Sequence, residues 1–274
     1  MENTLAVNIE RYDTRLYSDL AFRSKDGSTL RLYLIQPQSK QRHQFPLLIY
    51  IGGGGWRTIH PERHLPELTH IAELGFVVAS MEYHTTYREH FPVQIEDVKN
   101  AIRYLRSDAE HLGINKEKVF LAGGSAGAYL AVMSGLTGGT GSFRGSEYLE
   151  ESDDVSGVIG LYGIYNFRHF EQLDETSWKN QPYISRFLPN HDNCSLNTAS
   201  ADTYSRNNQI PVLLIHGLSD HMVPYSQSVE LYDQLEKDGH WVQLVLIENA
   251  DHADVHFSQP VVQKMMIDFL QSNL

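Results

Sequence analysis

One stretch in the middle of the chain decides the fold: Val119-Phe120-Leu121-Ala122-Gly123-Gly124-Ser125-Ala126-Gly127-Ala128-Tyr129-Leu130-Ala131. Its first four residues are apolar and predict a short buried strand, and the alanine-rich second half predicts a helix that begins at Ala126. Between the two, the chain must turn from strand to helix within a few residues. Such a turn strains the backbone of Ser125 and brings neighbouring segments close to it, so we expect that only glycine fits at 123 and 127.

The spacing Gly123-x-Ser125-x-Gly127 is the pattern of a nucleophile elbow. This turn raises the serine hydroxyl above the edge of a sheet, at a helix N-terminus where negative charge is favoured. The pattern alone is weak, because turns without any chemistry also contain it. The strand predicted before it and the helix predicted after it make Ser125 a candidate nucleophile.

Apolar segments on both sides of this stretch predict further strands and helices. A half-exposed antiparallel pair is expected within residues 18–37, around a tight turn at 25–28. The other predicted strands cover residues 46–51, 76–80, 155–161, 211–215 and 242–247, and the predicted helices cover 62–74, 92–112, 126–136, 226–238 and 259–270. Strands that alternate with helices predict an α/β fold, with a mostly parallel central sheet flanked by helices on both faces.

Residues 166–209 interrupt this alternation, because the segment is polar, aromatic and irregular. It predicts a cap or lid inserted above the sheet. The sequence contains no internal repeat, low-complexity tract or linker, so we expect residues 1–274 to form a single α/β domain that carries this insertion.

Composition excludes several classes of protein. The chain has 274 residues and a net charge of −12, without a Lys/Arg cluster, which argues against a nucleic-acid surface. Its single cysteine, Cys194, excludes an intramolecular disulfide framework and is typical of a reducing compartment. No signal peptide or membrane-spanning run is visible. We expect a cytoplasmic protein, a monomer or homodimer, with no membrane partner.

A serine nucleophile needs a base within hydrogen-bond reach and an acid that orients this base. Asp220 follows the predicted strand 211–215, and His252 follows the predicted strand 242–247. The order serine, acid, histidine, each after a separate strand, predicts that Ser125, Asp220 and His252 converge.

Other residues compete for two of these roles. His216 and His256 are alternative bases, and we expect His216 to be a structural hydrogen-bonding group at the end of its strand. Asp251 and Asp254 are alternative acids, which we expect to be solvated.

Acyl transfer also needs N–H donors for the oxyanion of the tetrahedral intermediate. The N–H of Ala126 is one candidate, and the glycine run Gly52–Gly55 after the strand 46–51 is the other, with Gly54 as its central donor and Gly53 or Gly55 beside it. No Gly-Lys-Ser/Thr is present, which argues against a phosphate loop. Trp56 either packs this loop or lines the acyl pocket.

No metal site is predicted. The chain has no His-Glu-x-x-His and one cysteine. The pairs His60/His64 and His252/His256 have a four-residue spacing, but neither has an evident third ligand.

From about residue 46 to its C-terminus, the chain resembles the α/β-hydrolase superfamily, in particular esterases with a His-Gly-Gly-Gly-Trp oxyanion motif. Residues Gly123-Gly124-Ser125-Ala126-Gly127 are similar to those of its feruloyl/acetylxylan esterase-like and arylformamidase-like branch. His216-Gly217-x-x-Asp220-x-x-Val223-Pro224 resembles the acid loop of these enzymes. The histidine of the motif is Gly52 here, so any hydrogen bond that this histidine makes within the loop is missing.

The resemblance implies roles for the residues already named, and it implies no cofactor. Ser125 is the nucleophile, Asp220 orients the base His252, and Gly54 and Ala126 donate to the oxyanion. The implied activity is a serine hydrolase that cleaves short-chain carboxylic esters, with acetyl esters of sugars as one candidate substrate. Two alternatives stay open: an amidase or peptidase of the arylformamidase type, and a non-catalytic binding protein with a hydrolase fold.

Overall fold

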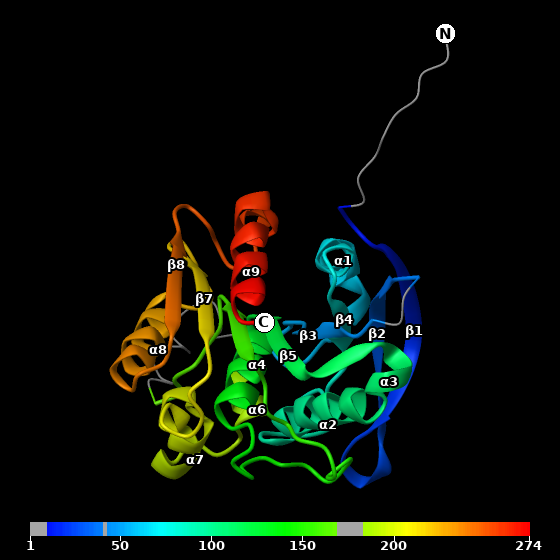
Figure 1. Ribbon diagram of the computed structural model, residues 1–274. Coiled ribbons are helices and arrows are strands. Elements are labelled where there is room, and N and C mark those ends of the chain that lie inside the picture. Colours follow the sequence, from blue (N-terminus) through cyan, green and yellow to red (C-terminus); the bar gives the residue numbers. More distant parts are fainter. Residues whose placement is uncertain (1–9, 41–42, 169–182) are drawn as a thin grey trace.

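The computed structural model describes residues 10–40, 43–168 and 183–274. Within these residues lies an eight-stranded sheet with the order β1-β2-β4-β3-β5-β6-β7-β8 (Figure 1). Its strands are β1 (Asp13–Arg23), β2 (Thr29–Gln38), β3 (Phe45–Ile51), β4 (Val77–Met81), β5 (Ile114–Gly124), β6 (Gly157–Leu161), β7 (Val212–Gly217) and β8 (Val242–Ile247). β1 pairs antiparallel with β2 and β2 pairs antiparallel with β4, whereas the other neighbouring strands pair parallel.

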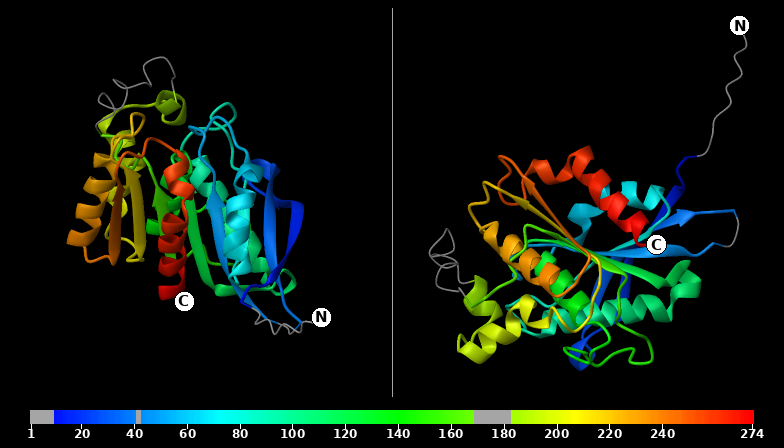
Figure 2. Two further views of the ribbon diagram at one scale, coloured as in Figure 1. Left: turned by 90° about the horizontal axis from the view of Figure 1, so that it is seen from above. Right: turned by 60° about the vertical axis from the view of Figure 1, so that its left-hand side comes forward.

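Helices cover both faces of this sheet, as the alternating pattern predicts (Figure 2). One face carries α1 (Leu65–Glu73) and α9 (Pro260–Ser272), and the other carries α2 (Val93–Ser107), α4 (Ala126–Leu136) and α8 (Ser226–Lys237). The hydrophobic core is therefore divided into two clusters, one on each side of the strands. Burial on both faces explains the continuous apolar runs in the central strands, where Leu47, Leu48 and Ile49 are fully buried.

Two helices differ from the sequence-based expectation by more than two residues at an end. The helix expected over 62–74 is a 3-10 turn, η2 (Pro61–His64), followed by α1. Pro66 lies in the first turn of α1, where its missing N–H removes no intrahelical hydrogen bond. The helix expected over 92–112 is divided at Asp108 into α2 and the short α3 (Ala109–Leu112), and it ends at Gly113 with φ 67°.

The predicted hairpin at the N-terminal edge of the sheet is present but longer than expected. β1 begins at Asp13, and the turn between β1 and β2 is a 3-10 turn, η1 (Lys25–Gly27). In β2, Leu30 and Leu32 are buried while Arg31 between them is exposed. This alternation confirms the prediction of a strand with one face toward the core.

The segment 166–209 lies only partly within the described residues. Its described part contains α6 (Tyr183–Phe187), α7 (Asn193–Ala199) and a 3-10 turn, η4 (Ala201–Tyr204), whereas Trp178 lies outside it. None of the described helices combines the length and the apolar character that crossing a bilayer requires.

Parallel pairing brings the ends of distant strands together. The carboxyl ends of β3, β5, β6, β7 and β8 lie at one edge of the sheet, and the loops that carry the glycine run, Ser125, Asp220 and His252 leave from this edge. Ligand sites of open parallel sheets form at such an edge.

Candidate active site

Ser125 occupies the turn between β5 and α4, with φ 54° and ψ −120°. Non-glycine residues rarely adopt this conformation, and surrounding structure must hold it in place. A Cβ at Gly123 would lie 2.4 Å from the carbonyl oxygen of Gly127, and a Cβ at Gly127 would lie 2.0 Å from that of Ile51. The predicted steric requirement for glycine at both positions is therefore confirmed.

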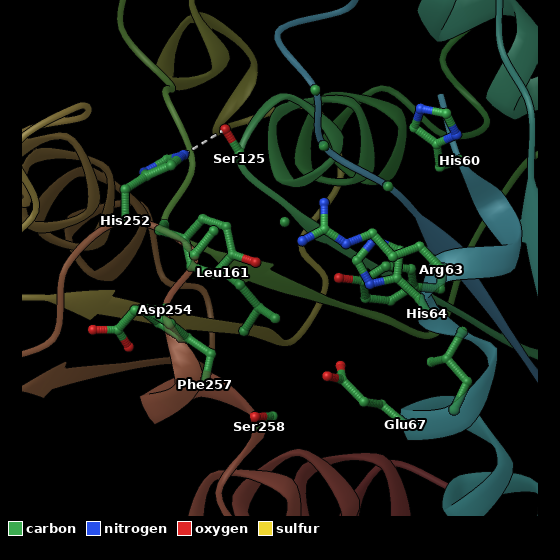
Figure 3. Close-up of a pocket in the computed structure, with 18 of the residues that line it drawn as sticks. His60, Arg63, His64, Glu67, Ser125, Leu161, His252, Asp254, Phe257 and Ser258 are labelled. Carbon is green, nitrogen blue, oxygen red and sulfur yellow. Dashed lines mark hydrogen bonds between the residues drawn. The ribbon is translucent and has the colours of Figure 1, made fainter. Parts of the chain in front are cut away.

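Three side chains predicted to converge form one hydrogen-bonded row, which we call the Ser125–His252–Asp220 row. The Ser125 Oγ lies 2.9 Å from Nε2 of His252 (Figure 3). On the other side of the ring, Nδ1 lies 2.8 Å from Oδ2 of Asp220. Both side chains behind the serine are shielded from water, with exposed fractions of 8% for His252 and 0% for Asp220.

The surroundings of Asp220 fix its charge and its orientation. Its Oδ1 accepts hydrogen bonds from the N–H groups of Met222, at 2.9 Å, and Val223, at 2.8 Å. Burial raises the pKa of Asp220, but hydrogen bonds from His216 and His252 outweigh burial and hold this pKa well below its usual range. The carboxylate therefore accepts a hydrogen bond from the N–H at Nδ1 of His252. The other ring nitrogen, Nε2, is left as an acceptor for the Ser125 hydroxyl.

His216, the competing base, does not reach Ser125. Its Nε2 lies 3.1 Å from Oδ2 of Asp220 and 3.0 Å from the carbonyl oxygen of Val223, and its Nδ1 lies 2.7 Å from the hydroxyl of Ser228. The ring is fully buried. His216 is thus the structural hydrogen-bonding group that the sequence predicted, and it supports the acid loop.

The competing acids differ in part from the expectation that both are solvated. Asp251 has a half-exposed side chain, and its Oδ1 accepts the N–H groups of His221 and His252. Asp254 is less exposed, at 28%, because it caps the 3-10 turn η5 (Val255–Ser258) and accepts the N–H of Asp251. Both carboxylates therefore shape the loop that carries His252. His256, the other candidate base, pairs with Asp254 at 2.8 Å.

Tyr162 belongs to this site, although the sequence analysis did not select it. Its ring meets the imidazole of His252 edge to face, with centroids 5.0 Å apart. Its hydroxyl lies 2.6 Å from the position that a Cβ on Gly124 would occupy. Tyr162 follows β6 directly and has a φ of 42°. A lone tyrosine after a strand gives no sequence signal for such a contact.

The glycine run faces the serine turn at close range. A Cβ at Gly53 would lie 2.8 Å from the carbonyl oxygen of Gly124 and 3.1 Å from Cβ of Ser125. No described residue accepts a hydrogen bond from the N–H groups of Gly53, Gly54, Gly55 or Ala126. These four N–H groups are therefore not used by the described part of the chain, and Gly53 is the one whose backbone lies against Ser125.

A tyrosine holds the start of the glycine run, where the histidine of the motif is absent. The buried hydroxyl of Tyr83 donates a 3.1 Å hydrogen bond to the carbonyl oxygen of Gly52. Gly52 in place of the histidine predicts a missing hydrogen bond at this position, and Tyr83 supplies one from outside the loop, which no sequence pattern indicates.

Trp56 packs the loop, which decides between the two interpretations left open for it. Its ring is buried and stacks on Phe187 of α6, with centroids 4.0 Å apart. Phe187 also accepts a backbone hydrogen bond from Phe91. The indole is not among the cavity-lining side chains, whereas Tyr183 is, and a Cβ at Gly55 would lie 2.5 Å from the Tyr183 ring.

A cavity of about 470 Å³ opens in front of Ser125 and His252. Figure 3 shows these two residues at one side of the cavity and, at the other side, His60, Arg63, His64 and Glu67. Apolar side chains form much of the remaining lining: Leu68, Ile71, Leu161, Met222, Val255, Phe257 and Met266. The site thus combines an activated hydroxyl, unused N–H donors and room for a small molecule.

The family model named BD-FAE matches residues 32–235 of this sequence. The chain belongs to the BD-FAE family. The match includes Ser125, Asp220 and the glycine run, and it ends before His252.

Several relatives with curated names are esterases. The chain is 30% identical over 226 residues to esterase LipQ of Mycobacterium tuberculosis, which covers 80% of this chain and 52% of LipQ. It spans about half the length of the curated relatives it matches.

Two solved structures have the same fold as this BD-FAE family member. A bifunctional GH43-CE protein of Bacteroides eggerthii has a TM-score of 0.83 and 23% identity, over 94% of this chain and 38% of that protein. A thermophilic esterase of Thermogutta terrifontis with propionate bound has a TM-score of 0.76 and 21% identity, over 95% of this chain and 94% of that protein. The predicted α/β-hydrolase fold is confirmed.

The described part of the chain contains no group of three or more His, Cys, Asp or Glu side chains that could hold a metal ion. Of the two histidine pairs considered, His60 lies beside Glu62, and the ring of His64 packs on Tyr50 with centroids 4.7 Å apart.

Proposed function

We propose that this chain is a serine carboxylesterase that cleaves short-chain esters through an acyl-enzyme. The observation that carries the proposal is the Ser125–His252–Asp220 row, which ends on a strained serine beside unused N–H donors. Membership of the BD-FAE family and the name of the relative LipQ support it.

In the first half of the proposed reaction, the Ser125 Oγ attacks the ester carbonyl carbon while Nε2 of His252 takes the hydroxyl proton. The carbonyl oxygen becomes an oxyanion, and the N–H groups of Ala126 and of Gly53 or Gly54 stabilise it. Removing one such donor raises the barrier by about 2.7–4 kcal/mol in enzymes of this kind. His252 then gives the proton to the alkoxide as the carbon–oxygen bond breaks, and the alcohol leaves.

In the second half, a water molecule replaces the alcohol. Nε2 of His252 takes a proton from this water as its oxygen attacks the acyl carbon, and the same N–H groups hold the second oxyanion. The bond to Ser125 Oγ breaks, and the serine takes the proton back from His252. The products are a carboxylic acid and an alcohol, and Asp220 stays ionised throughout.

The proposed substrates carry small acyl groups. A cavity of about 470 Å³ suits a small ester, and an acetyl esterase of Salmonella schwarzengrund and an ethyl acetate hydrolase of Pseudomonas putida are among the relatives. Acetyl esters of sugars stay one candidate. We further propose that the chain is a single domain in which 166–209 is a cap over this cavity, since Tyr183 lines it.

We also propose a cytoplasmic monomer or homodimer. The single, exposed Cys194 supports a reducing compartment. Cell fractionation, and light scattering of the purified protein, test these two statements.

A panel of p-nitrophenyl esters from acetate to octanoate tests the activity. We expect hydrolysis that declines with chain length and a serine that reacts with a fluorophosphonate probe. Loss of both in Ser125→Ala is the expected control result, and equal rates for the two proteins would refute the proposal. A preference for formyl anilides over all esters would favour the arylformamidase type of activity.

A further inference from the structure

The wall of the cavity opposite His252 is polar, in contrast to the apolar side chains beside His252. It is formed by His60, η2 and the first turn of α1, whose polar lining residues are His60, Arg63, His64 and Glu67. Figure 3 shows the guanidinium group of Arg63 pointing from this wall into the cavity. A substrate in the cavity therefore meets a cation on one side.

The guanidinium group of Arg63 has no partner within the part of the chain that the structure describes. The main-chain N–H of Arg63 donates a hydrogen bond to the carbonyl oxygen of His60, but no described residue accepts a hydrogen bond from its guanidinium group, and no described carboxylate lies within ion-pair distance of that group. Other arginines pair with carboxylates: Arg11, Arg31, Arg103, Arg168 and Arg206. Unlike these five arginines, Arg63 lines the cavity in front of Ser125.

Two observations connect this wall with the glycine run and with the residues around His252. The ring of His64, adjacent to Arg63, lies 3.6 Å from the position that a Cβ on Gly52 would occupy. Burial raises the pKa of Tyr162, Glu67 raises it further, and Arg63 lowers it, so both charges act on this ring. Tyr162 in turn contacts His252 at 5.0 Å between ring centroids.

Resting on the esterase activity proposed above, we propose that Arg63 is a specificity-determining residue that binds a carboxylate carried by the ester substrate. Its planar guanidinium group can donate two parallel hydrogen bonds to such a group. His64 supports the same ligand. Burial, followed by the charge of Arg63, lowers the pKa of His64, so its ring is neutral at pH 7 and can donate one N–H.

Glu67 should have the opposite effect to Arg63 on the choice of substrate. Its carboxylate lines the same wall one helical turn after Arg63, and it repels an anionic substrate group while it would attract a cationic one. Removing the charge of Glu67 should therefore favour the substrates that removing the charge of Arg63 disfavours.

Two pairs of matched esters test the proposal. 4-Acetoxybenzoate and 4-acetoxybenzamide differ by a carboxylate on the alcohol side, and phenyl hydrogen glutarate and phenyl glutaramate differ by one on the acyl side. We expect wild-type protein to prefer the carboxylate ester in at least one pair, which also tells on which side of the ester bond Arg63 acts. Arg63→Met should lower kcat/KM for that ester by roughly ten- to a hundredfold and leave its amide partner unchanged.

Three further variants sharpen the test. Arg63→Lys keeps the charge without the planar fork and should recover part of the preference. Glu67→Gln should increase the preference. Arg15→Met makes the same charge change on exposed β1, outside the cavity lining, and should alter neither ester. Equal effects of Arg63→Met on both members of both pairs, or no carboxylate preference in the wild type, would overturn the inference.

Binding measurements separate this inference from the proposed esterase activity. In the Ser125→Ala background, calorimetry should show weaker binding of the preferred carboxylate ester after Arg63→Met and unchanged binding of its amide partner. This difference needs no turnover. A protein that hydrolyses none of the four esters but shows the binding difference contradicts the esterase proposal alone, and unchanged binding contradicts the role of Arg63 alone.

Discussion

In two hydrogen-bonded rows of the described part of the chain, Nε2 of a histidine faces a serine and Nδ1 faces an aspartate, and one of these rows lies outside the cavity lining. In this second row, the Ser28–His84–Asp97 row, Oγ of Ser28 lies 3.2 Å from Nε2 of His84. Nδ1 of His84 lies 3.0 Å from both oxygens of Asp97. The residue types and the order of contacts are those of the Ser125–His252–Asp220 row.

The two rows differ in where the serine proton goes. The Ser28 hydroxyl donates a 2.8 Å hydrogen bond to the carbonyl oxygen of Lys25, so its oxygen accepts a hydrogen bond from the N–H at Nε2 of His84. Since Nδ1 of His84 also donates, to Asp97, this ring carries two protons. The hydrogen bond to Asp97 raises the pKa of His84 more than burial lowers it, which agrees with a charged ring. A charged His84 has no lone pair to take a proton from serine.

The backbone around the two serines differs as well. Ser28 has an ordinary extended conformation, with φ −60° and ψ 152°, and it does not line the cavity. Asp97 also accepts the N–H of His84 and the hydroxyl of Ser24. The Ser28 row therefore ties the η1 turn to α2, as a clamp. The comparison teaches that three residue types in the right order are not sufficient, because activation requires a strained serine, a neutral base and free N–H donors.

The two rows should differ most in how kcat responds to removal of the serine hydroxyl. Ser125→Ala should lower kcat for p-nitrophenyl acetate by roughly a millionfold, because removing such a nucleophile elsewhere costs about this much. Ser28→Ala should leave kcat unchanged. Steady-state kinetics of both variants check this, together with labelling by a fluorophosphonate. Labelling at Ser28 would contradict the comparison.

Removing the carboxylate charge should lower the activity in one row and the stability of the fold in the other. Asp220→Asn should lower kcat by about ten-thousandfold, because the amide favours the wrong tautomer of His252. Asp97→Asn leaves the buried His84 without its carboxylate partner and should lower the free energy of unfolding by roughly 3 kcal/mol.

The activity of folded Asp97→Asn should equal that of the wild type, as measured after active-site titration, with denaturant unfolding for stability. If this variant does not fold, Ser24→Ala is the milder test of the same cluster. A loss of kcat at Asp97 as large as that at Asp220 would show that the clamp also serves catalysis.

Much of the fold and the centre of the site could be predicted because each depends on local patterns. Continuous apolar runs identify strands buried on both faces, and the glycines at 123 and 127 are required by contacts within a few ångströms. Asp220 and His252 could be placed because parallel pairing brings the ends of β7 and β8 to the edge where β5 ends.

The residues that the sequence did not reveal depend on contacts between distant segments. Helical spacing places Lys99, Arg103 and Arg106 on the polar face of α2, yet Lys99 and Arg103 are buried and bind carbonyl oxygens of the loop 137–154. The contact of Tyr162 with His252 depends in the same way on where two loops meet. The spacing of apolar residues along the chain does not indicate which distant segment a polar side chain will contact.

Substituting a glycine of the run by alanine tests whether its free N–H groups take part in catalysis. The Ser28 row has no such glycine run beside it. The added Cβ in Gly53→Ala would lie 2.8 Å from the carbonyl oxygen of Gly124, so either the loop or the serine turn must move. We expect kcat to fall by roughly a hundredfold, the effect of one lost oxyanion donor. Gly27→Ala, directly before Ser28, is the matched control beside the other row. It has open space but a φ of 75°, so it should cost about 1 kcal/mol of stability and no activity. A Gly53→Ala variant with full kcat would remove this loop from the mechanism.

The smallest expected effect is the pH dependence of stability that the clamp contributes. Because the folded pKa of His84 is raised above that of the unfolded chain, about 6.5, its contribution is complete below that value and is lost as pH rises through the folded pKa. The difference in free energy of unfolding between wild type and His84→Gln should therefore shrink as pH rises. In an Asp97→Asn background the same difference should no longer show this dependence. Nitrogen-15 spectra of the imidazoles provide the direct check, since below the folded pKa His84 should carry protons on both nitrogens. If His84 instead has one free nitrogen there, the two rows have the same protonation, and strain and free N–H donors alone must account for their difference.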